Sequence, residues 1–197
     1  MQIYAVDFSH DGKFFVTAGD DSLQLWRHGI DVNSTSATKE TKSMKPLNGV
    51  YNKLKSPTCF IDVACGIDSA SKKIYALTAD GNMCCFDEKL TLDSWTFMHA
   101  KRGHAISLAG DKVFVAGAEG IVRTFSSDSL AYCGSFPTLP ALGFESAPDA
   151  PKFDVLCIRA VSNSKVSIHC NHICISNCST DTDLNEQSIL LRGICKP

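Results

Sequence analysis

The His and Cys side chains between residues 169 and 178 are the first group whose types and spacing could do chemistry. His169, Cys170, His172 and Cys174 fall in one short run, and Cys178 follows. Zinc binds Cys and His at short spacing, but its sites usually need two pairs of ligands separated by a longer loop. The segment has no CxxC pattern and no second pair at that distance. We therefore expect no metal and no cofactor, and a small metal-binding module remains the alternative interpretation.

The other titratable residues stand at positions typical of structural turns. His104 follows Gly103 directly before an apolar run, and an imidazole there could act as a general base. Asp20, Asp80 and Glu119 each occupy a single position of a repeat, so they cannot converge as an acid/base pair. P-loop, GxSxG and HExxH motifs are absent from the sequence. We expect no catalytic residue, and the protein is not predicted to be an enzyme.

A lysine-rich segment interleaved with Ser and Thr lies between residues 34 and 55. It is predicted to be a solvated loop, and phosphorylation within it stays open. A second candidate, the run KKIYAL at 72–77, loosely fits a kinase docking motif, but Ile74 and Leu77 belong to a predicted strand and should be buried. The lysines of the first segment are Lys39, Lys42, Lys45, Lys53 and Lys55.

Four segments repeat one order of features: an alternating apolar run, a turn, a second run, a turn with an acid or amide, and a third run. In the first of them Tyr4, Val6 and Phe8 share one face. An acid or amide followed by a residue tolerant of tight turns favours a short hairpin. The repeats end near Trp26, Phe86, Phe125 and Asn177, and their turn positions are Asp20, Asp80, Glu119 and Asn171.

Period-2 alternation in β-branched and apolar runs predicts strands, and no long stretch has helical periodicity. Phe86 and Phe125 are 39 residues apart, close to the roughly 40–45 residues of a four-stranded propeller blade. Polar and Pro-containing inserts lengthen the other spacings and are predicted to be loops. The fold class is therefore predicted to be all-β, with about three and a half four-stranded blades. Because the segments resemble WD repeats, the expected architecture is a partial WD-repeat β-propeller.

Several strings carry a more specific resemblance. VDFSHDGKFFVTAG, YALTADGNMCCFDEK and AGAEGIVRTFSSDSLAYCGSFPTLP occur in this order, and Gly103-His104 precedes a strand as in WD repeats. The chain is similar to the family of mitogen-activated protein kinase-binding protein 1 and WD repeat-containing protein 62. The resemblance implies a cytoplasmic protein-interaction scaffold in stress-activated MAP kinase signalling, and for one branch an association with spindle poles and microtubules. Its implied partners are MAP kinase-pathway components, centrosomal proteins, or the missing blades of the same propeller.

The resemblance assigns structural repeat positions to Asp20, Trp26, Asp80, Phe86, His104, Glu119 and Phe125. Residues 1–177 are predicted to form the partial propeller, and residues 178–197 are predicted to form a poorly ordered tail. The chain is predicted to be a fragment.

A net charge of -2 argues against a strongly basic binder of nucleic acid or membrane surfaces. No apolar run reaches the ~18 residues of a membrane helix. Without a secretory signal, the ten cysteines are expected to be reduced.

Overall fold

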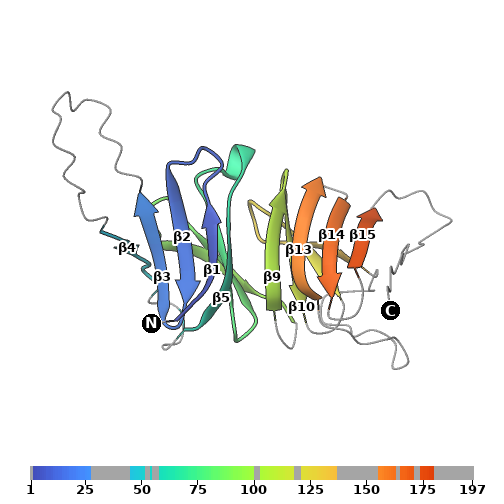
Figure 1. Cartoon of the computed structure of the whole chain (residues 1–197), viewed down its shortest axis with the longest axis horizontal. Coiled ribbons are helices and arrows are strands. Elements are labelled where there is room, and N and C mark those ends of the chain that lie inside the picture. Colours follow the sequence, from blue (N-terminus) through green and yellow to red (C-terminus); the bar gives the residue numbers. More distant parts are fainter. Residues whose placement is uncertain are drawn as a thin grey trace, which may run out of the picture.

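The computed structural model describes residues 2–27, 45–51, 54, 58–99, 103–117, 121–136, 155–162, 165–170 and 174–179 (Figure 1). Within them the chain forms four antiparallel sheets in which consecutive strands are neighbours. Sheet 1 contains β1 (Ile3–Phe8), β2 (Phe14–Gly19), β3 (Ser22–Arg27) and β4 (Leu47–Asn48). Sheet 2 contains β5 (Phe60–Cys65), β6 (Ile74–Thr78), β7 (Asn82–Phe86) and β8 (Leu92–Phe97), with the short 3-10 helix η1 (Asp68–Ala70) between its first two strands.

Sheet 3 and sheet 4 continue the same pattern. Sheet 3 contains β9 (Gly103–Ala109), β10 (Lys112–Gly117), β11 (Val122–Ser126) and β12 (Tyr132–Phe136). Sheet 4 contains β13 (Val155–Ser162), β14 (Lys165–Cys170) and β15 (Cys174–Ser179). Residues from 180 onward, most of the predicted tail, lie outside the described residues. Three four-stranded sheets and one three-stranded sheet agree with the prediction of about three and a half blades.

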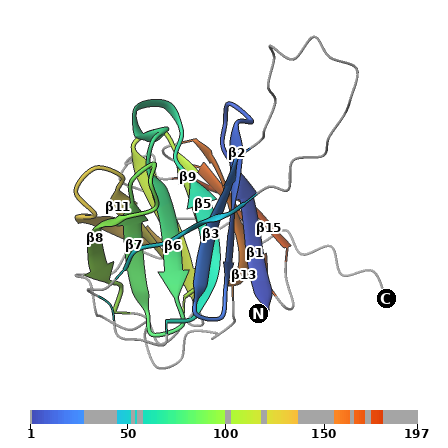
Figure 2. The same cartoon turned by 90° about the vertical axis from the view of Figure 1, so that its left-hand side faces the viewer.

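The first strands of the four sheets lie next to one another. Contacts join β1 to β5, β5 to β9 and β9 to β13. Figure 1 shows β1 beside β5 and β9 beside β13, and Figure 2 shows sheets 1 and 2 beside each other from the side. Antiparallel meanders packed face to face through their first strands form the blade arrangement of a β-propeller.

Each of the first three sheets has a row of three directly paired residues that begins near the end of its third strand. The rows are Trp26–Phe15–Phe8 in sheet 1, Phe86–Ile74–Cys65 in sheet 2 and Phe125–Val113–Leu108 in sheet 3. Phe86 and Phe125 are fully buried, whereas Trp26 is half-buried. As repeat ends, all three residues are predicted from the sequence to be buried. That prediction is wrong for Trp26, because no sheet in the described part of the chain covers its face of sheet 1.

Two hydrophobic clusters fill the spaces between sheets 1, 2 and 3. In the first, Val16 and Leu25 of sheet 1 pack with Ile74 and Phe86 of sheet 2. The second cluster joins the opposite face of sheet 2 to sheet 3, and it includes Tyr75, Leu77, Met83, Val113 and Phe125. Every residue of β6 is buried, and its apolar side chains alternate between the first cluster and the second. Each large apolar side chain buried this way contributes about 1.5–3 kcal/mol.

In sheets 2 and 3, the turn between the third and fourth strands contains a leucine with a left-handed backbone conformation, which the sequence pattern does not predict. Leu90 has a φ of 60° and Leu130 a φ of 56°, both in the left-handed region. Their side chains are nonetheless buried, Leu90 in the first cluster and Leu130 in the second. A non-glycine residue in this region costs about 1–2 kcal/mol, which burial of the leucine side chain offsets.

Candidate protein-interaction surfaces

Asp20, one of the predicted turn acids, lies between β2 and β3 and connects sheet 1 to sheet 2. Its Oδ1 accepts a hydrogen bond from the Tyr4 hydroxyl at 2.9 Å and one from the Cys59 thiol at 3.5 Å. The neighbouring Asp21 Oδ1 accepts the backbone N–H of Thr58 at 3.3 Å. The bond to Asp20 raises the pKa of Tyr4, and burial together with Asp20 raises the pKa of Cys59. These contacts hold two sheets together, which is a structural role.

Three side-chain oxygens on first strands bind backbone N–H groups of the next sheet. Asp7 Oδ2 accepts from Cys65 at 2.6 Å, Asp62 Oδ2 from Ile106 at 2.8 Å, and Ser107 Oγ from Ala160 at 2.9 Å. Desolvation by burial raises the pKa of Asp62 to about 6. Sequence reasoning missed these positions, although a lone polar residue inside an apolar strand was the available signal. One such bond at each junction fixes how neighbouring sheets meet.

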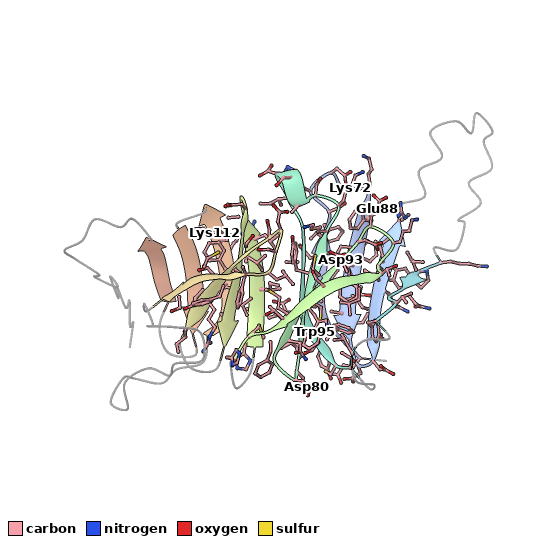
Figure 3. The ribbon with its side chains drawn as sticks, turned by 180° about the vertical axis from the view of Figure 1, so that it is seen from behind. Lys72, Asp80, Glu88, Asp93, Trp95 and Lys112 are labelled. Carbon is pink, nitrogen blue, oxygen red and sulfur yellow. The ribbon has the colours of Figure 1, made fainter. Side chains whose placement is uncertain are left out.

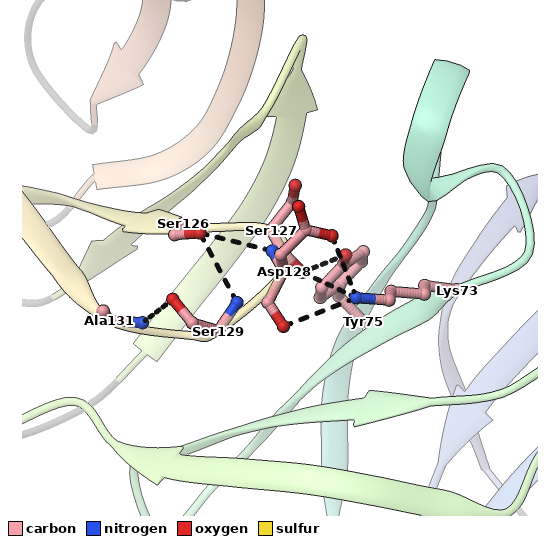
Figure 4. Close-up of polar contacts among 7 residues, drawn as sticks. All are labelled: Lys73, Tyr75, Ser126, Ser127, Asp128, Ser129 and Ala131. Atoms are coloured by element: carbon pink, nitrogen blue, oxygen red, sulfur yellow. Dashed lines mark hydrogen bonds and ion pairs between the residues drawn. The ribbon is translucent and has the colours of Figure 1, made fainter.

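A second group of polar contacts joins sheets 2 and 3 at the turn between β11 and β12 (Figure 4). The buried Tyr75 hydroxyl donates to the Ser127 carbonyl at 2.7 Å. Lys73 Nζ forms an ion pair with Asp128 Oδ1 at 3.2 Å and also donates to the Ser127 and Asp128 carbonyls. Ile74 and Leu77 of the same run are fully buried, as predicted, so these two apolar residues are not available to a docking kinase.

The remaining predicted repeat positions are only partly described. Asp80 is exposed in the turn between β6 and β7. His104 is half-buried, and its Nε2 has no hydrogen-bond partner among the described residues. Glu119 lies outside the described residues, as do Lys39, Lys42, Lys53 and Lys55 of the lysine-rich segment, while Lys45 is exposed.

The His/Cys segment is described through its backbone alone. Pairing across sheet 4 places His169 opposite Cys157 on one side and Cys174 on the other. With strands about 4.8 Å apart, the two cysteine backbones stand about 10 Å from each other, too far to share one zinc ion easily. His172 lies outside the described residues. Elsewhere in the described part of the chain no three His, Cys, Asp or Glu side chains are grouped to hold a metal ion.

One face of sheet 1, here called the open face, exposes apolar side chains. Tyr4, Val6 and Phe8 on β1 have exposed fractions of 45%, 53% and 62%. Phe15 stacks on Trp26 with ring centroids 5.9 Å apart, and Trp26 Nε1 donates to Thr17 Oγ1 at 3.1 Å. Contiguous apolar surface of this kind usually marks an interaction site.

A hollow of about 360 Å³ lies on sheet 1 near the turn between β2 and β3. Tyr51 donates to the Asp21 carbonyl at 3.1 Å on one side of it, and Gln24 donates to Asn48 at 3.0 Å. Its polar groups are thus partly engaged with one another. The lining residues are Asp20, Asp21, Ser22, Leu23, Gln24, Asn48, Gly49 and Tyr51.

Among the described residues, no helix has the length and apolar character needed to cross a bilayer.

Comparison with known structures defines the class of fold. The structure of U3-55K, a WD-repeat propeller, matches with a TM-score of 0.61 at 10% identity, covering 85% of this chain and 45% of that one. Likeness at this identity concerns the fold alone. The four sheets are therefore blades of the WD-repeat β-propeller type.

Sequence comparison gives the family. No protein-family model matches the chain. Mitogen-activated protein kinase-binding protein 1 is 31% identical over 146 residues in Mus musculus and 30% identical over 152 residues in Homo sapiens, each covering 74% of this chain and 10% of the relative. WD repeat-containing protein 62 of Mus musculus is 26% identical over 146 residues, covering 74% and 9%. The chain therefore belongs to the family of mitogen-activated protein kinase-binding protein 1 and WD repeat-containing protein 62, as the resemblance predicted, and it spans about a tenth of the length of these relatives.

Proposed function

We propose that this chain is a protein-interaction module, a group of propeller blades within a scaffold of MAP kinase signalling. The observation that carries the proposal is the open face of sheet 1. Val6 and Phe8 leave more than half of their surface exposed there. Apolar surface of this extent is stabilised when another protein surface covers it.

The rows of the neighbouring sheets indicate what kind of surface fits. Phe86 of sheet 2 and Phe125 of sheet 3 occupy the position of Trp26, and each is buried against the preceding sheet. The covering faces carry smaller aliphatic side chains such as Val16 and Ala18 of sheet 1. The open face therefore suits an aliphatic sheet face, and a further blade of the same propeller supplies one.

The names of the relatives support the wider setting. One of them is a mitogen-activated protein kinase-binding protein and the other contains WD repeats. We extend to this chain a cytoplasmic scaffold role in stress-activated MAP kinase signalling, with spindle-pole and microtubule association as the property of one branch. In this proposal Asp20, Trp26, Asp80, Phe86, His104, Glu119 and Phe125 maintain the blades and perform no chemistry.

Site-specific photo-crosslinking tests the proposal in cells. A photoreactive phenylalanine analogue replaces Val6 on the open face, and the same analogue replaces the exposed Lys72 as a matched control. We expect crosslinks from position 6, either to another blade of the same propeller or to another protein, well above those from position 72, identified by mass spectrometry. Equal yields at the two positions would show that the open face is bare in cells and would contradict the proposal.

A further inference from the structure

We propose that the outer edge of sheet 2, strand β8, binds an extended segment of a partner protein as an added strand that alternates basic and apolar side chains. The inference rests on the proposed function only in taking the chain to bind proteins. Three observations carry it: the direction of the backbone groups of β8, the exposure of Trp95 and Phe97, and the acidic residues beside them.

Among the described residues, Val50 alone pairs with the outer side of β8, and backbone groups farther along this strand have no such partner. Sheet 2 ends at β8 in the described part of the chain. Met98 N–H donates to the Gly81 carbonyl at 3.0 Å, and antiparallel pairs alternate, so the backbone groups of Trp95 and Phe97 point away from β7. A neighbouring strand could therefore pair with them.

The chain itself already uses the beginning of this edge. Val50 forms a parallel bridge with Thr91, donating to the Leu90 carbonyl at 2.9 Å and accepting from the Leu92 N–H at 2.8 Å. This single residue is a short strand addition at one end of β8. The register of β8 shifts at Asp93, and an extended peptide would pair beyond that shift, along Trp95 and Phe97.

The side chains of Trp95 and Phe97 are exposed for an identifiable reason. Trp95 stands opposite Cys84, as Ser135 of sheet 3 stands opposite Arg123. Ser135 is 5% exposed, whereas Trp95 is 48% and Phe97 44% exposed. The preceding sheet differs, because sheet 1 ends in the two-residue strand β4 while sheet 2 ends in the six-residue strand β8. Sheet 1 is thus too narrow at its outer end to cover Trp95.

The charges around β8 indicate a basic partner. Asp93 is exposed on the strand, and Glu88 and Asp80 are exposed in turns near its two ends. Figure 3 shows these three acids and Trp95 on the same side of the molecule. Lys89 and the exposed Arg27 lie at the Glu88 end, where Arg27 donates to the Glu88 carbonyl at 3.2 Å, so the acidic character is concentrated toward Asp93 and Asp80. A Lys or Arg facing Asp93 could also lie over the Trp95 ring.

The sequence of β8, LDSWTF, contains neither Pro nor Lys. Proteins commonly place these residues on exposed edge strands to prevent unwanted pairing. The strand does carry one charge and an irregular register at Asp93. Beyond Asp93, its aromatic side chains and outward backbone groups have the features of a strand-addition site.

Fluorescence anisotropy with a labelled peptide of alternating Lys and Val tests the inference on the full chain. We expect saturable binding that Trp95→Ser weakens about tenfold, since exposed aromatics commonly dominate such contacts. Asp93→Asn should weaken binding less and reduce its dependence on salt. Phe8→Ser, which removes an exposed aromatic from the open face of sheet 1, is the matched control and should leave binding unchanged.

Two further peptides separate strand pairing from non-specific attraction. N-methylation of alternate residues along the pairing edge should abolish binding, and a Glu-for-Lys peptide should not bind. Absence of binding up to about 1 mM, equal binding by the Trp95→Ser variant, or full binding of the N-methylated peptide would each overturn the inference. If crosslinking at position 6 succeeds while peptide binding fails, only the β8 site is rejected and the interaction module stands.

Discussion

The carboxylate of Asp62 gives the chain a defined dependence of stability on pH. Burial between sheets 2 and 3 raises its pKa from 3.8 to about 6, although it accepts N–H groups from Ile106 at 2.8 Å and Val63 at 2.9 Å. Between these two pH values the folded chain holds a proton that the unfolded chain has released. The free energy of unfolding therefore falls as pH rises from about 4 to about 6, and the full destabilisation by the charged carboxylate is present at neutral pH.

The size of that cost follows from the displacement of the pKa from 3.8 to about 6. At 1.36 kcal/mol per pH unit, the charged carboxylate disfavours folding by about 3 kcal/mol at pH 7. Asp62→Asn removes the charge and keeps an oxygen that can accept from Ile106, but a bond to a neutral acceptor is weaker by about 1 kcal/mol. We expect Asp62→Asn to stabilise the chain by about 1–2 kcal/mol at pH 7.5 and to have little effect near pH 4.

Urea unfolding followed by tryptophan fluorescence, repeated between pH 4 and pH 8, measures this difference. Asp93→Asn is the control, because Asp93 is exposed and its substitution should change stability by less than about 0.5 kcal/mol at every pH. Asp62→Ala also removes the charge but leaves the Ile106 N–H without this acceptor, so it should be less stable than Asp62→Asn by about 1–3 kcal/mol at every pH. A stability difference between Asp62→Asn and the parent chain that does not vary with pH would refute the reasoning.

Three other outcomes follow from the packing. Phe125→Ala should lose about 3–5 kcal/mol in urea unfolding because its side chain is fully buried, whereas Phe8→Ala, at a 62% exposed position, should lose under about 1 kcal/mol; similar losses would mean that the repeat register is wrong. Tyr75→Phe removes the 2.7 Å bond to Ser127 and should cost about 1 kcal/mol, while Lys73→Ala should cost under about 0.5 kcal/mol because Asp128 is exposed; the reverse order would contradict this account of the junction. Purified without chelators, the chain should carry less than one zinc per molecule by native mass spectrometry, and a full equivalent lost in Cys174→Ser would identify a metal site after all.

The repeating part of the fold was predictable because it depends on local patterns. Period-2 alternation located the first three strands of each repeat, and the spacing between Phe86 and Phe125 indicated four-stranded blades. Fourth strands were harder to locate. β8 and β12 are at sheet edges, so the pattern of LDSWTF reflects a single neighbouring strand and partial exposure.

Functional surfaces were less predictable because they depend on which neighbour is present. Trp26 and Phe86 occupy equivalent positions in sheets 1 and 2, yet Trp26 is half-buried and Phe86 fully buried. No local sequence pattern distinguishes the two positions. Asp62 has the same difficulty, since its role requires Ile106 of a different sheet. Trp95 is exposed because the neighbouring sheet 1 ends in the two-residue strand β4. Its exposure depends on tertiary packing and not on the sequence of β8.

The turns at Leu90 and Leu130 also bear on how these blades change during evolution. Glycine would relax the backbone at a φ of 60° or 56° but would remove a side chain from a buried cluster, and β-branched residues would fit the backbone less well. Each leucine is thus constrained both by its backbone conformation and by the burial of its side chain. Fewer substitutions are therefore acceptable there than at the other positions of the turn. We expect these two leucines to vary less among relatives than the exposed turn residues beside them. In this chain, a buried leucine two residues before the fourth strand thus marks where the outer strand of sheets 2 and 3 begins.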